Sequence, residues 1–172
     1  MNILLLPGIN QKTEKWGASL ISELALPDSS VTIQRYGHWD GTGGEQCMMM
    51  EAEIERLRGV EVDLLIGKSV GVVVGLLACQ KSVIAPKRAV FIGTPVTSFI
   101  EENIDLFQLV DGLSLPALYI QQKDDVVGTS GMLCERIGKA SQTTIVEVPG
   151  NNHQYKDVKQ LTRHIKKWLG EQ

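Results

Sequence analysis

Residues 62–80 read VDLLIGKSVGVVVGLLACQ, and this stretch decides the fold class. Its first part, Val62–Ile66, is a short and mostly apolar run that ends at a glycine, as buried β-strands often do. The segment Val70–Gln80 carries no charge and predicts a helix, although its valines have weak helix propensity and require tertiary burial to be helical. A strand followed at once by a helix is the repeating unit of α/β proteins.

The same alternation extends over the whole chain. Continuous apolar runs such as Leu64–Ile66 and Val90–Ile92 are typical of strands that helices cover on both faces of a parallel sheet. Apolar residues at helical spacing lie between such runs. We therefore predict a doubly wound α/β protein, a three-layer α/β/α sandwich with a mostly parallel sheet of about six strands. The predicted strands are Ile3–Leu6, Val31–Tyr36, Val62–Ile66, Ala89–Ile92, Ala117–Gln121 and Thr144–Val148.

Composition narrows the class of protein further. The chain has 172 residues, of which 43% are hydrophobic, and shows no repeat or linker, so residues 1–172 are expected to form a single domain. A net charge of −3 without a basic stripe argues against nucleic-acid and membrane partners. No uncharged stretch approaches the roughly 20 residues of a membrane span, and no signal peptide is expected.

Cysteine and histidine usage predicts neither disulfides nor a metal site. The three cysteines, Cys47, Cys79 and Cys134, are odd in number and have no metal-ligand spacing, which indicates reduced thiols and a cytoplasmic location. The three histidines lie far apart in the sequence, and no His- or Asp-rich ligand cluster is present. We expect no metal and no cofactor.

Residues 67–71 form a G-x-S-x-G pattern centred on Ser69, placed between the predicted strand and helix. This is where a nucleophilic serine is presented on a sharp and strained turn. Gly67 and Gly71 leave room for neighbouring elements to approach. The N-terminus of the following helix directs free N–H groups at the hydroxyl, so the Val70 N–H can support an oxyanion.

A serine nucleophile requires a histidine base. His153 follows the last predicted strand in a Pro-Gly-Asn-Asn turn and is the preferred base. His38, in the loop after the second predicted strand, is the second choice. His164 lies within the C-terminal helix and is a poor candidate.

The base in turn requires a carboxylate that orients it. Asp124 and Asp125 both follow the strand Ala117–Gln121, and residue spacing alone does not separate them. With Ser69 before them and His153 after them, the chain order is Ser, Asp, His. All three groups are expected at carboxyl ends of parallel strands, where a substrate can reach them together.

On these residues the chain resembles the α/β-hydrolase superfamily, in particular small lid-less serine hydrolases such as the retinoblastoma-binding-protein hydrolase group and related bacterial proteins. The resemblance rests on Pro7-Gly8, residues 67–71, residues 123–127 and residues 149–153, and it spans nearly the whole chain. It implies a compact fold without a cap domain, since the stretch from Gly93 to Ser98 is too short for one. It also implies hydrolysis of small ester, thioester or amide substrates through an acyl-enzyme intermediate.

The resemblance also implies particular site residues. The family's Asp-x-x-Val-Pro turn aligns with residues 124–128, which makes Asp124 the preferred acid and Asp125 the runner-up. The oxyanion hole would pair the N–H of Val70 with that of Ile9, and Asn10 is the alternative to Ile9.

Three residues differ from the family pattern. Gln121 stands where glycine often precedes the acid, Gly128 replaces the proline, and Lys68 replaces a histidine next to the serine. None of these differences removes a group of the predicted triad. Lys68 has two interpretations: a cation that favours an anionic substrate near the mouth of the site, or a solvated side chain beside the turn. We prefer the second and assign Lys68 no role.

Two other classes of protein were weighed against a hydrolase. A non-catalytic α/β-hydrolase-like binding or scaffold protein would keep the fold, and its natural partner would be a protein or small ligand that the sequence does not define. A nucleotide-binding domain would need a glycine-rich anion loop after the first strand, where only Gly8 occurs. The Gly41–Gly44 segment lacks a phosphate-loop pattern and predicts a turn leading into a helix.

Overall fold

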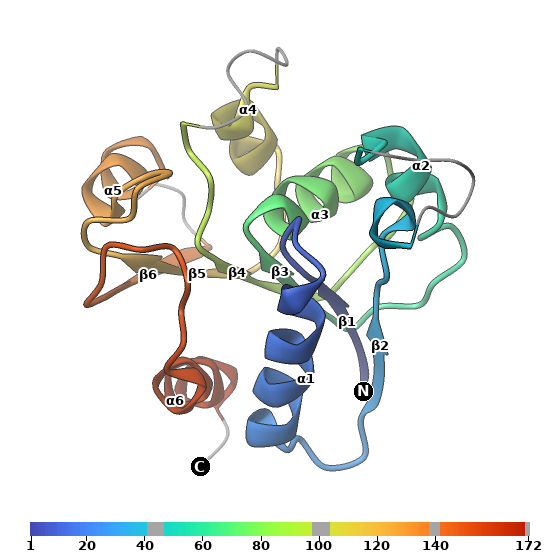
Figure 1. Cartoon of the computed structure of the whole chain (residues 1–172), viewed down its shortest axis with the longest axis horizontal. Helices are drawn as coiled ribbons and strands as arrows, with labels where there is room; N and C mark the ends of the chain where they lie inside the picture. Colours follow the sequence, from blue (N-terminus) through green and yellow to red (C-terminus); the bar gives the residue numbers. More distant parts are fainter. Residues whose placement is uncertain (41–46, 98–103, 138–141, 171–172) are drawn as a thin grey trace.

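A computed structural model describes residues 1–40, 47–97, 104–137 and 142–170 (Figure 1). Six strands form one sheet in the order β2-β1-β3-β4-β5-β6, and all neighbouring strands are parallel. The chain starts with β1, adds β2 on one side of it as an edge strand, and then adds β3 to β6 in order on the other side. The strands are β1 (Asn2–Leu6), β2 (Ser30–Ile33), β3 (Leu64–Lys68), β4 (Arg88–Ile92), β5 (Ala117–Gln122) and β6 (Thr143–Val148).

Helices cover both faces of this sheet (Figure 1). On one face lie α1 (Lys12–Leu24) and α6 (Val158–Leu169), which pack on each other. On the other lie α2 (Met50–Glu55), α3 (Val70–Gln80), α4 (Leu106–Asp111) and α5 (Ser130–Ile137). Two separate apolar clusters, one on each face, fill the space between the layers. The predicted three-layer α/β/α sandwich is confirmed.

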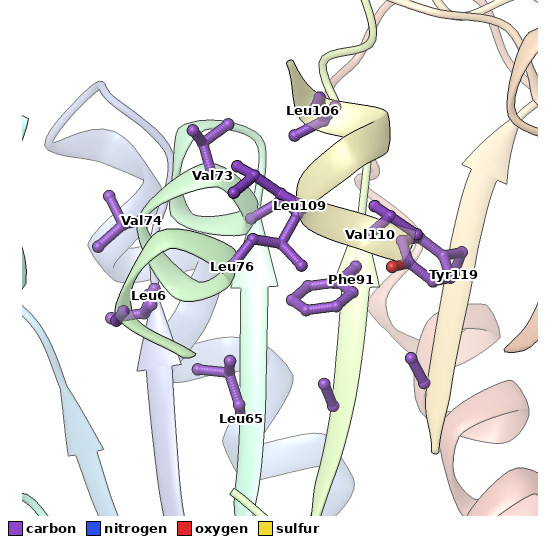
Figure 2. Close-up of a cluster of buried hydrophobic side chains, with 14 of the residues drawn as sticks. Leu6, Leu65, Val73, Val74, Leu76, Phe91, Leu106, Leu109, Val110 and Tyr119 are labelled. Atoms are coloured by element: carbon purple, nitrogen blue, oxygen red, sulfur yellow. The ribbon is translucent and has the colours of Figure 1, made fainter. Parts of the chain in front are cut away.

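The larger cluster explains why the valine-rich segment is helical. Along α3, the side chains of Val72, Val73 and Val74 are fully buried between the sheet and its neighbours α2 and α4. Figure 2 shows this region, where Leu76 of α3 and Leu109 of α4 lie over Phe91 of β4. Burial of this apolar surface outweighs the weak helix propensity of β-branched residues.

The predicted bounds of the second and third strands are wrong. The second strand ends at Ile33 and not at Tyr36, because the chain then turns into a short 3₁₀ helix, η1 (Gly37–Trp39). That turn is held by buried polar contacts: the Tyr36 hydroxyl donates to the Pro7 carbonyl, and the Gly37 N–H donates to the Glu53 carboxylate. The third strand begins at Leu64 and runs on to Lys68, which pairs with Ile92 of β4.

Some expectations fall on residues outside the described ranges. The turn expected at residues 41–44 lies there, as does Ser98 in the connection expected to be too short for a cap domain. Among the helices that the structure describes, none combines the length and hydrophobicity that crossing a bilayer requires.

Candidate active site

The turn between β3 and α3 places Ser69 at the carboxyl end of the sheet. Ser69 has φ 54° and ψ −121°, a strained conformation that non-glycine residues rarely adopt. Its N–H still donates to the Ile92 carbonyl at 3.0 Å, which anchors the turn on β4. The close approach expected at Gly71 is present, since a Cβ atom there would lie 2.1 Å from the Leu6 carbonyl oxygen.

Ser69 and His153 meet across this edge of the sheet. The Nε2 atom of His153 lies 2.8 Å from the Ser69 hydroxyl oxygen, and its Nδ1 atom lies 2.9 Å from Oδ2 of Asp125. A carboxylate can only accept, so Nδ1 carries the proton. In the neutral ring Nε2 is then free to accept the hydrogen bond from the Ser69 hydroxyl. The serine, imidazole and carboxylate therefore form one continuous chain of hydrogen bonds.

The carboxylate in this chain is that of Asp125, which corrects the expected preference for Asp124. The Asp124 side chain is exposed, and its backbone N–H donates to the Gly150 carbonyl. The Asp125 side chain turns inward and accepts from the Val127 N–H as well as from His153. Adjacent residues in a tight turn point in different directions, so a shift of one position in the alignment exchanges the solvent-facing and inward-facing carboxylates.

A tyrosine that the sequence analysis did not single out completes the Asp125 environment. The buried Tyr155 hydroxyl donates to Oδ2 of Asp125 at 2.7 Å and accepts from the Gln122 N–H. Burial raises the pKa of Tyr155. The hydrogen bond from the Gln122 N–H lowers it in part, and Asp125 raises it again, so the phenol keeps its proton and donates to Asp125. Burial alone would raise the pKa of Asp125, but hydrogen bonds from His153, Val127 and Tyr155 more than compensate and lower it.

The His153 loop is fixed to β5 by a buried glutamine. The side-chain oxygen of Gln122 accepts from the N–H groups of Asn152 and His153 at 3.1 and 3.0 Å. Gly150 has φ 140°, and a Cβ atom there would lie 2.5 Å from the Gln122 amide nitrogen, so only glycine fits. His153 itself has a positive φ of 59°. These contacts hold the loop in a strained conformation that presents the imidazole to Ser69.

The loop after β1 borders Ser69 from the other side. A Cβ atom on Gly8 would lie 3.6 Å from the Cβ of Ser69, so the backbone leading to Ile9 passes beside the hydroxyl. The Ile9 carbonyl accepts from Nε2 of His38 at 2.9 Å and from the Trp39 indole at 2.8 Å. Val70, the residue after Ser69, is the first residue of α3, where a backbone N–H has no acceptor within the helix.

Two of the alternative residues have other contacts. His38, the second-choice base, lies against the Ile9 carbonyl and stacks on Tyr36 at 5.9 Å between ring centroids. Asn10, the alternative to Ile9, lies just before α1: its side chain accepts from the Lys12 N–H, and its carbonyl accepts from Thr13, so neither contact involves the backbone N–H of Asn10.

Lys68 is buried, not solvated as the sequence suggested. Only 4% of its surface is exposed, and its ammonium lies 3.3 Å from the His153 carbonyl oxygen. The Trp16 and Tyr155 rings face it, with centroids at 5.4 and 5.7 Å, within the range of cation–π attraction. Burial lowers the pKa of Lys68 to about 8, and the negative charge of Asp125 limits the fall.

The lowered pKa of Lys68 predicts that the free energy of unfolding changes with pH in the alkaline range. The pKa of Lys68 is about 8 in the folded protein and has its ordinary value of 10.5 in the unfolded chain. Between these pH values the unfolded chain holds more protons, so the free energy of unfolding increases as pH rises. Relative to Lys68→Met, the wild type should gain about 3 kcal/mol across this interval. Urea unfolding of both proteins from pH 7 to 10.5 measures the difference, and parallel curves would contradict the prediction.

No family model and no curated protein sequence matches this chain, but solved structures do. The meta-cleavage product hydrolase of Pseudomonas fluorescens IP01 superposes with a TM-score of 0.77 at 10% identity, over 99% of this chain and 90% of that one. An esterase from Thermogutta terrifontis gives 0.75 at 16% identity, with coverages of 99% and 89%. A candidate hydrolase of the alpha/beta superfamily from Xanthomonas campestris pv. campestris gives 0.72 at 13%, covering 98% of each chain.

These similarities and the six-stranded parallel sheet define the class: the chain has the α/β-hydrolase fold. The expected likeness to the retinoblastoma-binding-protein hydrolase group within this superfamily stays a prediction. At 10–16% identity the superpositions describe the fold, and the function has to be argued from the side chains at the site.

Proposed function

We propose that this protein is a serine hydrolase with Ser69 as nucleophile, His153 as base and Asp125 as the carboxylate that orients the base. One observation carries the proposal: the unbroken hydrogen-bond chain from the Ser69 hydroxyl through His153 to Asp125, at 2.8 and 2.9 Å. A hydroxyl is activated for acyl transfer when it donates a hydrogen bond to one nitrogen of an imidazole whose other nitrogen donates to a buried carboxylate. Ser69, His153 and Asp125 have this arrangement.

The reaction follows from these contacts. The Ser69 oxygen forms a bond to the acyl carbonyl while its proton moves to Nε2 of His153, and the imidazolium then protonates the leaving group as the acyl bond breaks. Water, activated by the same imidazole, releases the acid and restores Ser69. The N–H groups of Val70 and Ile9 are the proposed donors to the oxyanion. These steps require no cofactor.

The proposed substrates are small esters, with thioesters and small amides as related acyl compounds. Two apolar side chains lie exposed in loops that border the triad: Ile9 beside Gly8 and Val126 next to Asp125, with 57% and 71% of their surfaces accessible. They offer an apolar acyl or leaving group a surface to cover. Structural neighbours that include an esterase support the same reaction class.

A cytoplasmic location is part of this proposal, supported by three cysteines that are all free.

A fluorophosphonate probe tests the proposal without knowledge of the substrate, because it labels only activated serines. Wild-type protein should be labelled, whereas Ser69→Ala and His153→Ala should not. Ser19→Ala is the matched control: Ser19 is an exposed serine of α1 whose hydroxyl donates to the Lys15 carbonyl, and its loss should leave labelling unchanged. If the folded wild type stays unlabelled, the proposed hydrolase activity is wrong, and the protein is better described as a non-catalytic binding protein.

A further inference from the structure

The residue that precedes the proposed nucleophile has a charged side chain that is almost completely buried. Lys68 ends β3 and points to the sheet face covered by α1 and α6, where Trp16 and Tyr155 face its ammonium. Its ammonium lies 3.3 Å from the carbonyl oxygen of His153. A buried ammonium is costly, and it persists only where nearby groups compensate for lost water.

The anion that compensates Lys68 is the carboxylate that holds His153. Asp125 is 3% exposed and attracts the Lys68 charge, while it accepts from Nδ1 of His153 and from the Tyr155 hydroxyl. In the resting site the opposite charges of Lys68 and Asp125 offset each other. When His153 takes a proton, a second positive charge appears within the same buried cluster.

We infer that Lys68 is a positioning residue whose charge sets how readily His153 accepts a proton, in addition to holding the His153 loop through its carbonyl. This inference rests on the proposed role of His153 as base. The Lys68 ammonium repels the positive charge that forms on the imidazole when it takes the Ser69 proton, whereas the Asp125 carboxylate attracts it. Lys68 itself gives up no proton in the reaction and touches no reacting atom.

The groups that face His153 come from several elements. Asp125 approaches from the loop after β5, Ser69 from the turn after β3, and Tyr155 from the same loop as His153, with ring centroids 5.9 Å apart. Gly93, after β4, adds no charge. From α1 the uncharged Trp16 faces Lys68, and its indole donates to the Tyr155 carbonyl at 2.8 Å.

Three substitutions separate the charge of Lys68 from its contact with the loop. Lys68→Met removes the charge and keeps an apolar chain of similar length, while Lys68→Arg keeps the charge. Trp16→Phe removes the indole hydrogen bond to the Tyr155 carbonyl, which loosens the same loop without a change of charge. Lys68→Gln replaces the methionine variant if that variant does not fold, as judged from its amide NMR spectrum.

The measurement is the NMR titration of the histidine ring Cε1–H signals. The chain has three histidines, so His153→Gln identifies the signal of interest. In Lys68→Met, the titration midpoint of His153 should move to higher pH by on the order of one unit, the size expected for removing a like charge several ångströms away. Lys68→Arg and Trp16→Phe should keep the wild-type midpoint. The acid limb of the pH profile for ester hydrolysis should shift by the same amount.

Two results would overturn the inference: an unchanged His153 midpoint in Lys68→Met, or an equal upward shift in Trp16→Phe, which would assign the effect to the loop. The titration requires no turnover, so it remains decisive in a protein that fails to react with the fluorophosphonate probe. A protein with unlabelled Ser69 but a shifted midpoint would refute the proposed function and retain the charge coupling.

Discussion

Replacing Asp125 with asparagine should lower kcat for a small activated ester such as p-nitrophenyl acetate by about 10⁴-fold. The asparagine amide can donate to Nδ1 of His153, which favours the ring tautomer with its proton on Nε2. That tautomer cannot accept the proton of Ser69. The substitution keeps the shape of the side chain but removes the negative charge that acts on buried Lys68, so kcat should be compared in protein that far-UV circular dichroism shows to be folded.

Asp124→Asn is the matched control for this prediction, since it makes the same chemical change one residue earlier. The Asp124 side chain is exposed, and its backbone contact to Gly150 does not depend on the carboxylate. The variant should retain kcat close to that of the wild type. Equal losses in both variants, or a larger loss in Asp124→Asn, would show that the hydrogen bond from His153 to Asp125 does not orient the base.

The second large effect is expected on folding. Gly71→Ala places a methyl group 2.1 Å from the Leu6 carbonyl oxygen and 2.6 Å from that of Pro7, and both are backbone atoms that cannot move aside. The improved helix propensity of alanine offsets only about 1 kcal/mol. We expect a loss of about 5 kcal/mol or more, comparable with the whole stability of a small domain. Far-UV circular dichroism and urea unfolding measure it.

Gly131→Ala separates this steric effect from helix propensity. Gly131 lies in α5, is exposed, and would meet its nearest neighbour, the Thr129 hydroxyl, at a comfortable 3.7 Å. Alanine there should stabilise the protein by up to about 1 kcal/mol. A Gly71→Ala protein that unfolds at the wild-type urea midpoint would show that β1 and α3 can separate without cost.

Most of the fold could be predicted because its signals are local. Six apolar runs correspond to six strands, and the α3 helix has the predicted bounds Val70–Gln80. The end of β2 could not be predicted, since it depends on Glu53, which is distant in sequence and accepts from the Gly37 N–H inside the protein. A tertiary contact of this kind leaves no periodic pattern near the residues it redirects.

The site was less predictable, because its geometry depends on single turns. Ser69 and His153 follow strands in an order that indicates a triad, and the structure brings them to 2.8 Å. The choice between Asp124 and Asp125 depends on the backbone angles of one loop, which sequence order does not specify. Tyr155 and Gln122 left no signal, since a buried tyrosine or glutamine becomes recognisable as a partner only when its neighbours are known.

The burial of Lys68 could not be predicted for a different reason. A lysine beside a turn is most often solvated, and the residue types near it do not contradict that expectation. Its burial results from strand pairing, because β3 continues through Lys68 opposite Ile92 and places the side chain under α1. The continuation of the strand through Gly67 and Lys68, two residues past its predicted end, thus buries a cation that was expected at the surface.

The separation of the triad along the chain connects reactivity with assembly. Ser69 and His153 are 84 residues apart, and the strands that precede them are not neighbours: β4 and β5 lie between β3 and β6. The hydrogen bond between serine and imidazole therefore exists only after the four strands β3 to β6 have paired. Loop-closure entropy delays contacts of such long range. A reactive Ser69 would therefore indicate that β3 to β6 have assembled, and a molecule in which these strands have not yet paired would not react.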